Sequence, residues 1–180
     1  MMIDLHRMKV CSLKSFAMSR KNDIDRVWDI VEKVGVCMLM TQFAGGLRAR
    51  PLEARPDRDA GLIFFVTDIH SPKEEEIKER PDIGLVFIDS SDKAYLSITG
   101  RACVIRDAEM TEAAWRKTDE VWRPGGPTDP SVCLLRIEPA TAELWDGPAS
   151  SVATAFEFAK AKLTGKKPNL GENRKVTVKM

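Results

Sequence analysis

Histidine is scarce in this chain, since its 180 residues include only His6 and His70. Enzymes that work without a cofactor usually pair a nucleophile with a base, and histidine is the commonest such base. No G-x-S-x-G segment accompanies His70, and two isolated histidines cannot supply the ligands of a zinc or iron site. The sequence therefore argues against the hydrolase and metalloenzyme classes.

Cysteine and long apolar runs are also sparse. The four cysteines, at positions 11, 37, 103 and 133, form no C-x-x-C pair. This spacing excludes the usual zinc motifs and a secreted disulfide framework, so we expect a reducing, cytoplasmic location. No uncharged apolar run approaches the ~18 residues of a membrane-spanning helix, so we expect no membrane partner.

The net charge is only +1, and it is unevenly distributed. Residues 1–21 carry +4 and residues 157–180 carry +5, which leaves −8 on residues 22–156. An acidic body repels nucleic acid, so we expect no nucleic-acid partner. The length favours one domain, which we expect over residues 22–180 with a C-terminal helix and tail. Residues 1–21 are predicted to be a disordered or extended leader.

Strand patterns dominate the centre of the chain. The alternation of apolar and polar residues predicts strands at 36–41, 47–55, 62–67, 83–88 and 94–105, a closing hairpin of 132–137 with 142–145, and a short edge strand at 174–179. Six or seven antiparallel strands with helices between them indicate a mainly β (α+β) fold, a small barrel with peripheral helices.

Helical signals lie between these strands. An apolar stripe predicts a helix from about Asn22 or Asp23 to Val34, ended by Gly35. Ser71-Pro72-Lys73-Glu74 has the pattern of a capping box with proline at the first helical position. Two further helices are predicted, at 109–122 and at about 151–163.

The most informative side chains are cationic. Arg48 and Arg50 alternate on a predicted strand and so point to one face. Ser71 and Lys73 sit at a helix N-terminus, where free N–H groups favour an anion. If the fold brings the two features together, they form a pocket for a phosphate dianion. In the alternative interpretation, the arginines pair with Glu53 or another acid and Ser71 merely caps the helix.

Trp145 allows two interpretations as well. It ends a predicted strand beside Asp146-Gly147, where an aromatic side chain can lie against a planar ring. Alternatively, it plugs the end of the barrel.

Several short segments, in order and spacing, resemble the FMN-binding split barrels of the pyridoxamine-phosphate-oxidase-like family, and especially their general stress protein branch. These segments are Arg50-Pro51-Leu52, Phe64-Phe65-Val66-Thr67-Asp68, Ser71-Pro72-Lys73, Tyr95-Leu96-Ser97-Ile98-Thr99-Gly100, Trp122-Arg123-Pro124-Gly125 with Asp129-Pro130, Ala142-Glu143-Leu144-Trp145-Asp146, and Leu163-Thr164-Gly165 through Gly171-Glu172-Asn173.

The resemblance implies a six- to seven-stranded antiparallel split β-barrel and a homodimer with FMN at the subunit interface. It implies that Arg50 and Lys73 hold the flavin phosphate with Ser71 beside them, and Arg48 is a supporting candidate. Pro51 and Leu52 belong to the same arginine motif. Val66 and Thr67 would flank the flavin, and Trp145 of the partner subunit would approach it.

Two departures from the family pattern bear on activity. Gly147-Pro148-Ala149-Ser150 follows Trp145 where true pyridoxamine-phosphate oxidases carry an R-x-H type of motif, and Glu53 and Arg55 stand where a substrate lysine is expected. We therefore expect an FMN-dependent oxidoreductase that acts on another small molecule, not vitamin B6 oxidation. The alternatives are a flavin-holding or flavin-sensing stress protein without turnover, and a split barrel that uses haem or a deazaflavin.

Overall fold

The computed structural model describes residues 23–146, 158, 160–165 and 172–176. The predicted leader, Asn22 and the start of the predicted last helix lie outside these residues. Of the predicted last helix, the described residues 158 and 160–163 are helical, and so is residue 164. Within the described part of the chain, no helix is both long enough and apolar enough to cross a membrane.

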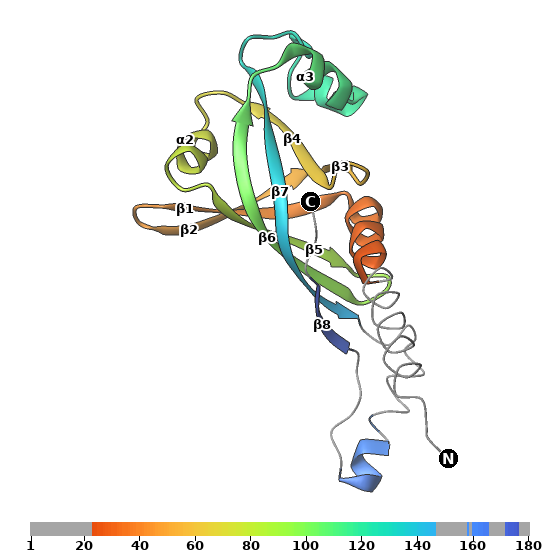
Figure 1. The fold of residues 1–180 in the computed structure, drawn as a ribbon. Helices are drawn as coiled ribbons and strands as arrows, with labels where there is room; N and C mark the ends of the chain where they lie inside the picture. Colours follow the sequence, from red (N-terminus) through yellow and green to blue (C-terminus); the bar gives the residue numbers. More distant parts are fainter. Residues whose placement is uncertain (1–22, 147–157, 159, 166–171, 177–180) are drawn as a thin grey trace, which may run out of the picture.

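One antiparallel sheet organises the molecule (Figure 1). Its strands are β1 (Val36–Phe43), β2 (Gly46–Glu53), β3 (Arg55–Asp57), β4 (Leu62–Asp68), β5 (Asp82–Asp89), β6 (Ala94–Ile105), β7 (Val132–Asp146) and β8 (Glu172–Val176). Seven of them follow the order β2-β1-β5-β6-β7-β4-β3, and β8 pairs with β7. The sheet bends around a core without closing, which confirms the predicted mainly β split barrel with peripheral helices.

The core lies on one face of the strands, because buried apolar residues alternate with more exposed ones. In β6, for example, Leu96 and Ile98 are fully buried while Tyr95 is exposed. The helix over residues 23–34 packs its apolar stripe, including Val27 and Trp28, onto this core. Gly35 ends that helix as predicted, with φ at +69° and its N–H donating to the carbonyl of Val31.

The predicted closing hairpin is wrong, because residues 132–146 form a single long strand, β7. Pro139 lies inside this strand, although proline removes a ladder hydrogen bond. The structure accommodates Pro139 at a bulge, where the register with β6 shifts between Thr99 and Gly100. A Cβ atom at Gly100 would clash with the Glu138 carbonyl oxygen, so glycine permits this close approach.

The predicted helix at 109–122 is also wrong in part. It is split into α3 (Ala108–Ala114) and the 3-10 helix η1 (Lys117–Val121), with Trp115 and Arg116 extended between them. Trp115 packs beside the small cluster of Val66, Val132 and Leu134, whereas Trp122 is 81% exposed. The two tryptophans therefore do not share one buried side.

The helix α2 (Pro72–Glu79) begins with proline as predicted, but it has no capping box. Ser71 makes no side-chain hydrogen bond at the cap, and the Glu74 carboxylate accepts instead from the backbone N–H of His70 at 2.6 Å. Lys78 and Arg106 also pair with this buried carboxylate. Glu74 thus fixes the turn that precedes Ser71, in which His70 has a φ of +61°.

These contacts predict an acid-sensitive α2. Hydrogen bonds from Lys78 and Arg106 lower the pKa of Glu74 from 4.5 to about 2. Because the pKa is lowered in the folded state, the carboxylate stabilises the protein above pH ~4.3, and this contribution is lost as the pH falls towards 2. Thermal melts of Glu74→Gln should therefore show a lower Tm at pH 7 and a shallower decline between pH 4.5 and 2.

The exposed neighbour Glu75 offers the matched control, since Glu75→Gln should melt with the wild-type pH profile. If Glu74→Gln retains the wild-type acid sensitivity, the stabilising role of this carboxylate is wrong.

Candidate functional site

Three segments gather their polar groups at one end of the sheet: β2, the end of β4, and the first turn of α2. Lys73 in this first turn is half-buried, and burial lowers its pKa. The positive charges of Arg50 and Arg123 lower that pKa further, while Asp68 acts in the opposite direction. The charge of the strand arginine therefore acts on the helix lysine.

The two strand arginines share an acid that sequence reasoning did not identify. Arg48 donates to Glu76 at 2.8 Å, and Arg50 donates to both oxygens of the same carboxylate at 2.9 and 3.1 Å. Thr41 on β1 completes the group with a hydrogen bond of 2.6 Å to Glu76. Both arginines thus share one face, as predicted, and their acidic partner is Glu76 and not Glu53.

Burial on its own raises the pKa of Glu76, but the hydrogen bonds from Arg50 and Thr41 outweigh it and hold the pKa below the ordinary value. This carboxylate is consequently charged at neutral pH. We call Thr41, Arg48, Arg50 and Glu76 the arginine–glutamate cluster.

Two hydroxyl groups, one at the end of β4 and one just before α2, are buried without a partner. Within the described part of the chain, the Thr67 and Ser71 hydroxyl oxygens have no hydrogen-bond partner. A buried hydroxyl without a partner costs roughly 1–3 kcal/mol, so such atoms commonly mark the place of a missing ligand or water. Both residues were predicted to contact the cofactor, and both lie within seven residues of Lys73. Hydroxyl and ammonium donors together suit an anion such as a phosphate.

A hollow of about 470 Å³ lies between β2, the end of β4 and the segment that follows η1, and Thr67, Ser71 and Lys73 are not among its lining residues. Its lining includes Pro51 and Leu52 of β2, Val66 and Asp68 of β4, and Trp122 and Arg123 that follow η1, together with Glu53, Arg55 and Asp119. Three of the predicted cofactor residues therefore line one hollow. Its volume lies within the usual range of small-molecule sites, about 300–1,000 Å³.

Arg123 is a site residue to which sequence reasoning gave no role. Its Nε and Nη2 donate to the two carboxylate oxygens of Asp68 at 2.9 and 3.1 Å. This fork fixes the loop after η1 against the end of β4. The Trp122-Arg123-Pro124-Gly125 segment was noted as a family pattern, but spacing alone does not show that it reaches β4.

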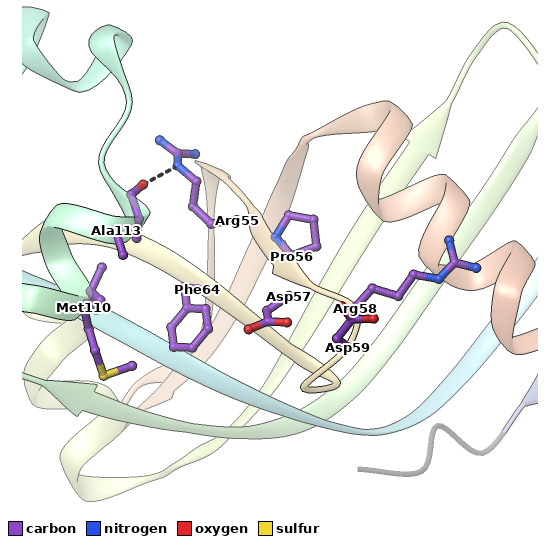
Figure 2. Close-up of a pocket in the computed structure, with 10 residues that line it drawn as sticks. Arg55, Pro56, Asp57, Arg58, Asp59, Phe64, Met110 and Ala113 are labelled. Carbon is purple, nitrogen blue, oxygen red and sulfur yellow. Dashed lines mark hydrogen bonds between the residues drawn. The ribbon is translucent and has the colours of Figure 1, made fainter.

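A larger hollow of about 510 Å³ lies between the β3–β4 turn and α3 (Figure 2). It contains none of the residues that the sequence predicted to bind a cofactor. Arg55 forms the wall that it shares with the smaller hollow, and there the buried guanidinium binds Asp119, the Glu53 carbonyl and the Ala114 carbonyl. Figure 2 shows Arg58 pointing away from this hollow, towards the helix over residues 23–34, where it pairs with Asp25 and Asp29.

Trp145 lies at the end of β7 that pairs with β8, and Figure 1 shows this end of β7 on the side away from α2. Its cross-strand partner is Tyr95, which in turn lies opposite Ile88. All three side chains are at least 36% exposed, as are Val36 and Met38 on β1. We call these five residues the outer apolar stripe. Within one subunit, the structure does not bring Trp145 to the other predicted site residues.

Comparison with known proteins assigns the chain to a family. The family model "Pyridoxamine 5'-phosphate oxidase like" matches residues 22–169. General stress protein 26 of Bacillus subtilis is 27% identical over 131 residues, which cover 71% of this chain and 91% of that protein.

Two solved structures are similar in fold. One is assigned as a general stress protein 26 from Jannaschia sp. CCS1, with 30% identity, a TM-score of 0.68, and coverage of 87% of this chain and 98% of that one. The other is the general stress FMN/FAD binding protein from Xanthomonas citri, with 25% identity, a TM-score of 0.65, and coverage of 72% and 92%. The family match spans most of the sheet and every residue of the candidate site, so this chain belongs to the pyridoxamine 5'-phosphate oxidase like family.

Proposed function

We propose that this protein is an FMN-binding flavoprotein that acts as an oxidoreductase on a small molecule in the cytoplasm. The observation that carries the proposal is that the hydroxyls of Thr67, at the end of β4, and of Ser71, two residues before Lys73, are both buried without a partner. The name of the Xanthomonas citri relative, which binds FMN or FAD, supports a flavin as the ligand. FMN ends in a phosphate monoester, whose dianion suits these donors.

Different residues of the site would bind different parts of FMN. Lys73, Ser71 and Thr67 would hold the phosphate, with Arg50 adding positive charge from β2. Pro51, Leu52 and Val66 would pack along the flavin in the hollow of about 470 Å³, where they exclude water. When bound, the flavin supplies the capacity to accept and return electrons or hydride.

A second copy of the chain would complete the site. Pro51 lines the hollow and lies opposite Met38 in the β1–β2 register, so the hollow borders the outer apolar stripe. Exposed apolar stripes of this kind commonly mark protein interfaces. A homodimer packed through this face would bury the stripe and would bring the partner's Trp145 towards the flavin.

The cysteines support the cytoplasmic assignment. The described cysteines, Cys37, Cys103 and Cys133, are all free. Burial raises the pKa of Cys37 to about 12 and that of Cys133 to about 11, so neither thiol is a ready nucleophile at neutral pH.

Flavin titration tests the phosphate assignment. Quenching of flavin fluorescence should show that the wild type binds FMN more tightly than riboflavin, which lacks the phosphate. Arg50→Ala and Lys73→Ala should each weaken FMN binding by about 1.5–3 kcal/mol, roughly 10- to 150-fold, because each removes a charge-assisted bond. Neither variant should change riboflavin binding comparably.

The exposed Lys162 supplies the control, since Lys162→Ala removes an equal charge outside the site and should bind FMN as the wild type does. A wild type that binds neither flavin would refute the proposal. Rapid reduction of the bound FMN by NADH or NADPH, followed by electron transfer to an acceptor, would distinguish an oxidoreductase from a flavin holder.

Sedimentation velocity tests the assembly. Tyr95→Lys places a charge in the middle of the outer apolar stripe, so it should convert a dimeric wild type into monomers and weaken FMN binding. Val121→Lys alters an exposed apolar residue that lies outside the stripe, and it should leave the dimer intact. A monomeric wild type that binds FMN fully would contradict the shared site.

A further inference from the structure

Glu76 is a buried acid close in sequence to Lys73, which we propose binds a phosphate. It lies three residues after Lys73, close to one helical turn further along α2, and its side chain is only 8% exposed. Both carboxylate oxygens are fully engaged. Oε1 accepts from Arg48 and Arg50, and Oε2 accepts from Arg50 and Thr41.

This geometry commits the outer end of the Arg50 guanidinium. Nη1 donates to Thr41 and Glu76, and Nη2 donates to Glu76. These bonds use three of the five guanidinium N–H groups, so a phosphate that approaches Lys73 would have to share Arg50 with a carboxylate that already holds Nη1 and one N–H of Nη2. The dianion and the carboxylate carry charges of the same sign in a partly buried region, where such repulsion is weakly screened.

We propose that Glu76 is an internal competitor of the phosphate, a carboxylate that holds Arg50 before the cofactor arrives and lowers the affinity of the site for phosphate dianions. The proposal rests on the proposed function and adds a regulatory property to it: the cofactor is held reversibly. Glu76 is a positioning residue, because it acts on the phosphate through Arg50.

A purely structural role for Glu76 makes a different prediction. If the carboxylate only braces α2 against β2, its loss would loosen the hollow and weaken FMN and riboflavin alike. If it competes with the phosphate, its loss would strengthen FMN binding and leave riboflavin unchanged. The comparison of the two ligands therefore separates the two roles.

Glu76→Gln provides the test, because the amide is nearly isosteric with the carboxylate and carries no charge. Fluorescence titration at low salt should give FMN binding at least about tenfold tighter than in the wild type, since juxtaposed like charges are costly. Riboflavin binding should stay within about twofold. The gain for FMN should shrink as salt is raised, because screening weakens the repulsion that was removed.

Glu79→Gln is the matched control. Glu79 lies on the same helix, but it is exposed and pairs only with the neighbouring Arg80 among the described residues. This variant changes the net charge equally and should bind both ligands as the wild type does. An equal gain in Glu79→Gln would overturn the proposal, because the effect would then come from overall charge.

The outcomes separate the two hypotheses. Unchanged or weaker FMN binding in Glu76→Gln, with a wild type that binds FMN, overturns the competitor role and leaves the proposed function standing. A wild type that binds no FMN overturns both. If Glu76→Gln is unstable alone, saturating FMN should restore its Tm, because the phosphate takes the place of the lost carboxylate. Failure of FMN to restore it would also overturn the proposal.

Discussion

The attachment of α2 to the sheet depends on ion pairs more than on apolar packing. The helix is highly polar, and Ile77 is its buried apolar residue. Its other buried side chains are Glu74, which pairs with Arg106 after β6 as well as with Lys78 of the same helix, and Glu76, which pairs with Arg48 and Arg50 of β2. Burying a charge is favourable only when partners satisfy it, so these pairs fix where α2 can sit.

The position of α2 in turn determines the character of the site. Because its carboxylates face β1, β2 and the end of β6, its first turn is directed towards the end of β4. Thr67 at the end of β4, and Ser71 and Lys73 at the start of α2, belong to this part of the chain, and a hollow lined by β2 and β4 includes their sequence neighbours Val66 and Asp68. The same ion pairs that hold the helix thus leave hydroxyl and ammonium donors available for an anion. Glu76 holds the helix to β1 and β2, and under our proposal the same acid would also affect anion binding.

The sequence predicted the strands well, because alternation reports burial on one face directly. The range 94–105 agrees with β6 residue for residue. It failed where tertiary contacts override local signals. A hairpin was predicted over 132–145, yet a bulge at Pro139 and the missing side chain of Gly100 keep β7 continuous. Ser71 and Glu74 matched the sequence pattern of a capping box, but the Glu74 carboxylate instead pairs with Lys78 and Arg106 and accepts a hydrogen bond from the His70 N–H.

The candidate site was predicted in part for similar reasons. Period-two alternation placed Arg48 and Arg50 on one face, which is a local property. It could not show which acid meets them, since Glu76 is 26 residues away from Arg50. The sequence of α2 did carry one indication that an acid is buried there. Ile77 is its apolar residue, so a helix of this composition must bury charged side chains if it packs against the sheet. Arg123 carried no such signal, because only the fold shows that it reaches Asp68.

A crystal structure of the protein with FMN tests the central claim most directly. The account predicts the phosphate within about 3 Å of the Thr67 and Ser71 hydroxyls and the Lys73 ammonium, so that both hydroxyls gain a partner. A phosphate bound elsewhere, with those two hydroxyls still unpartnered, would contradict it.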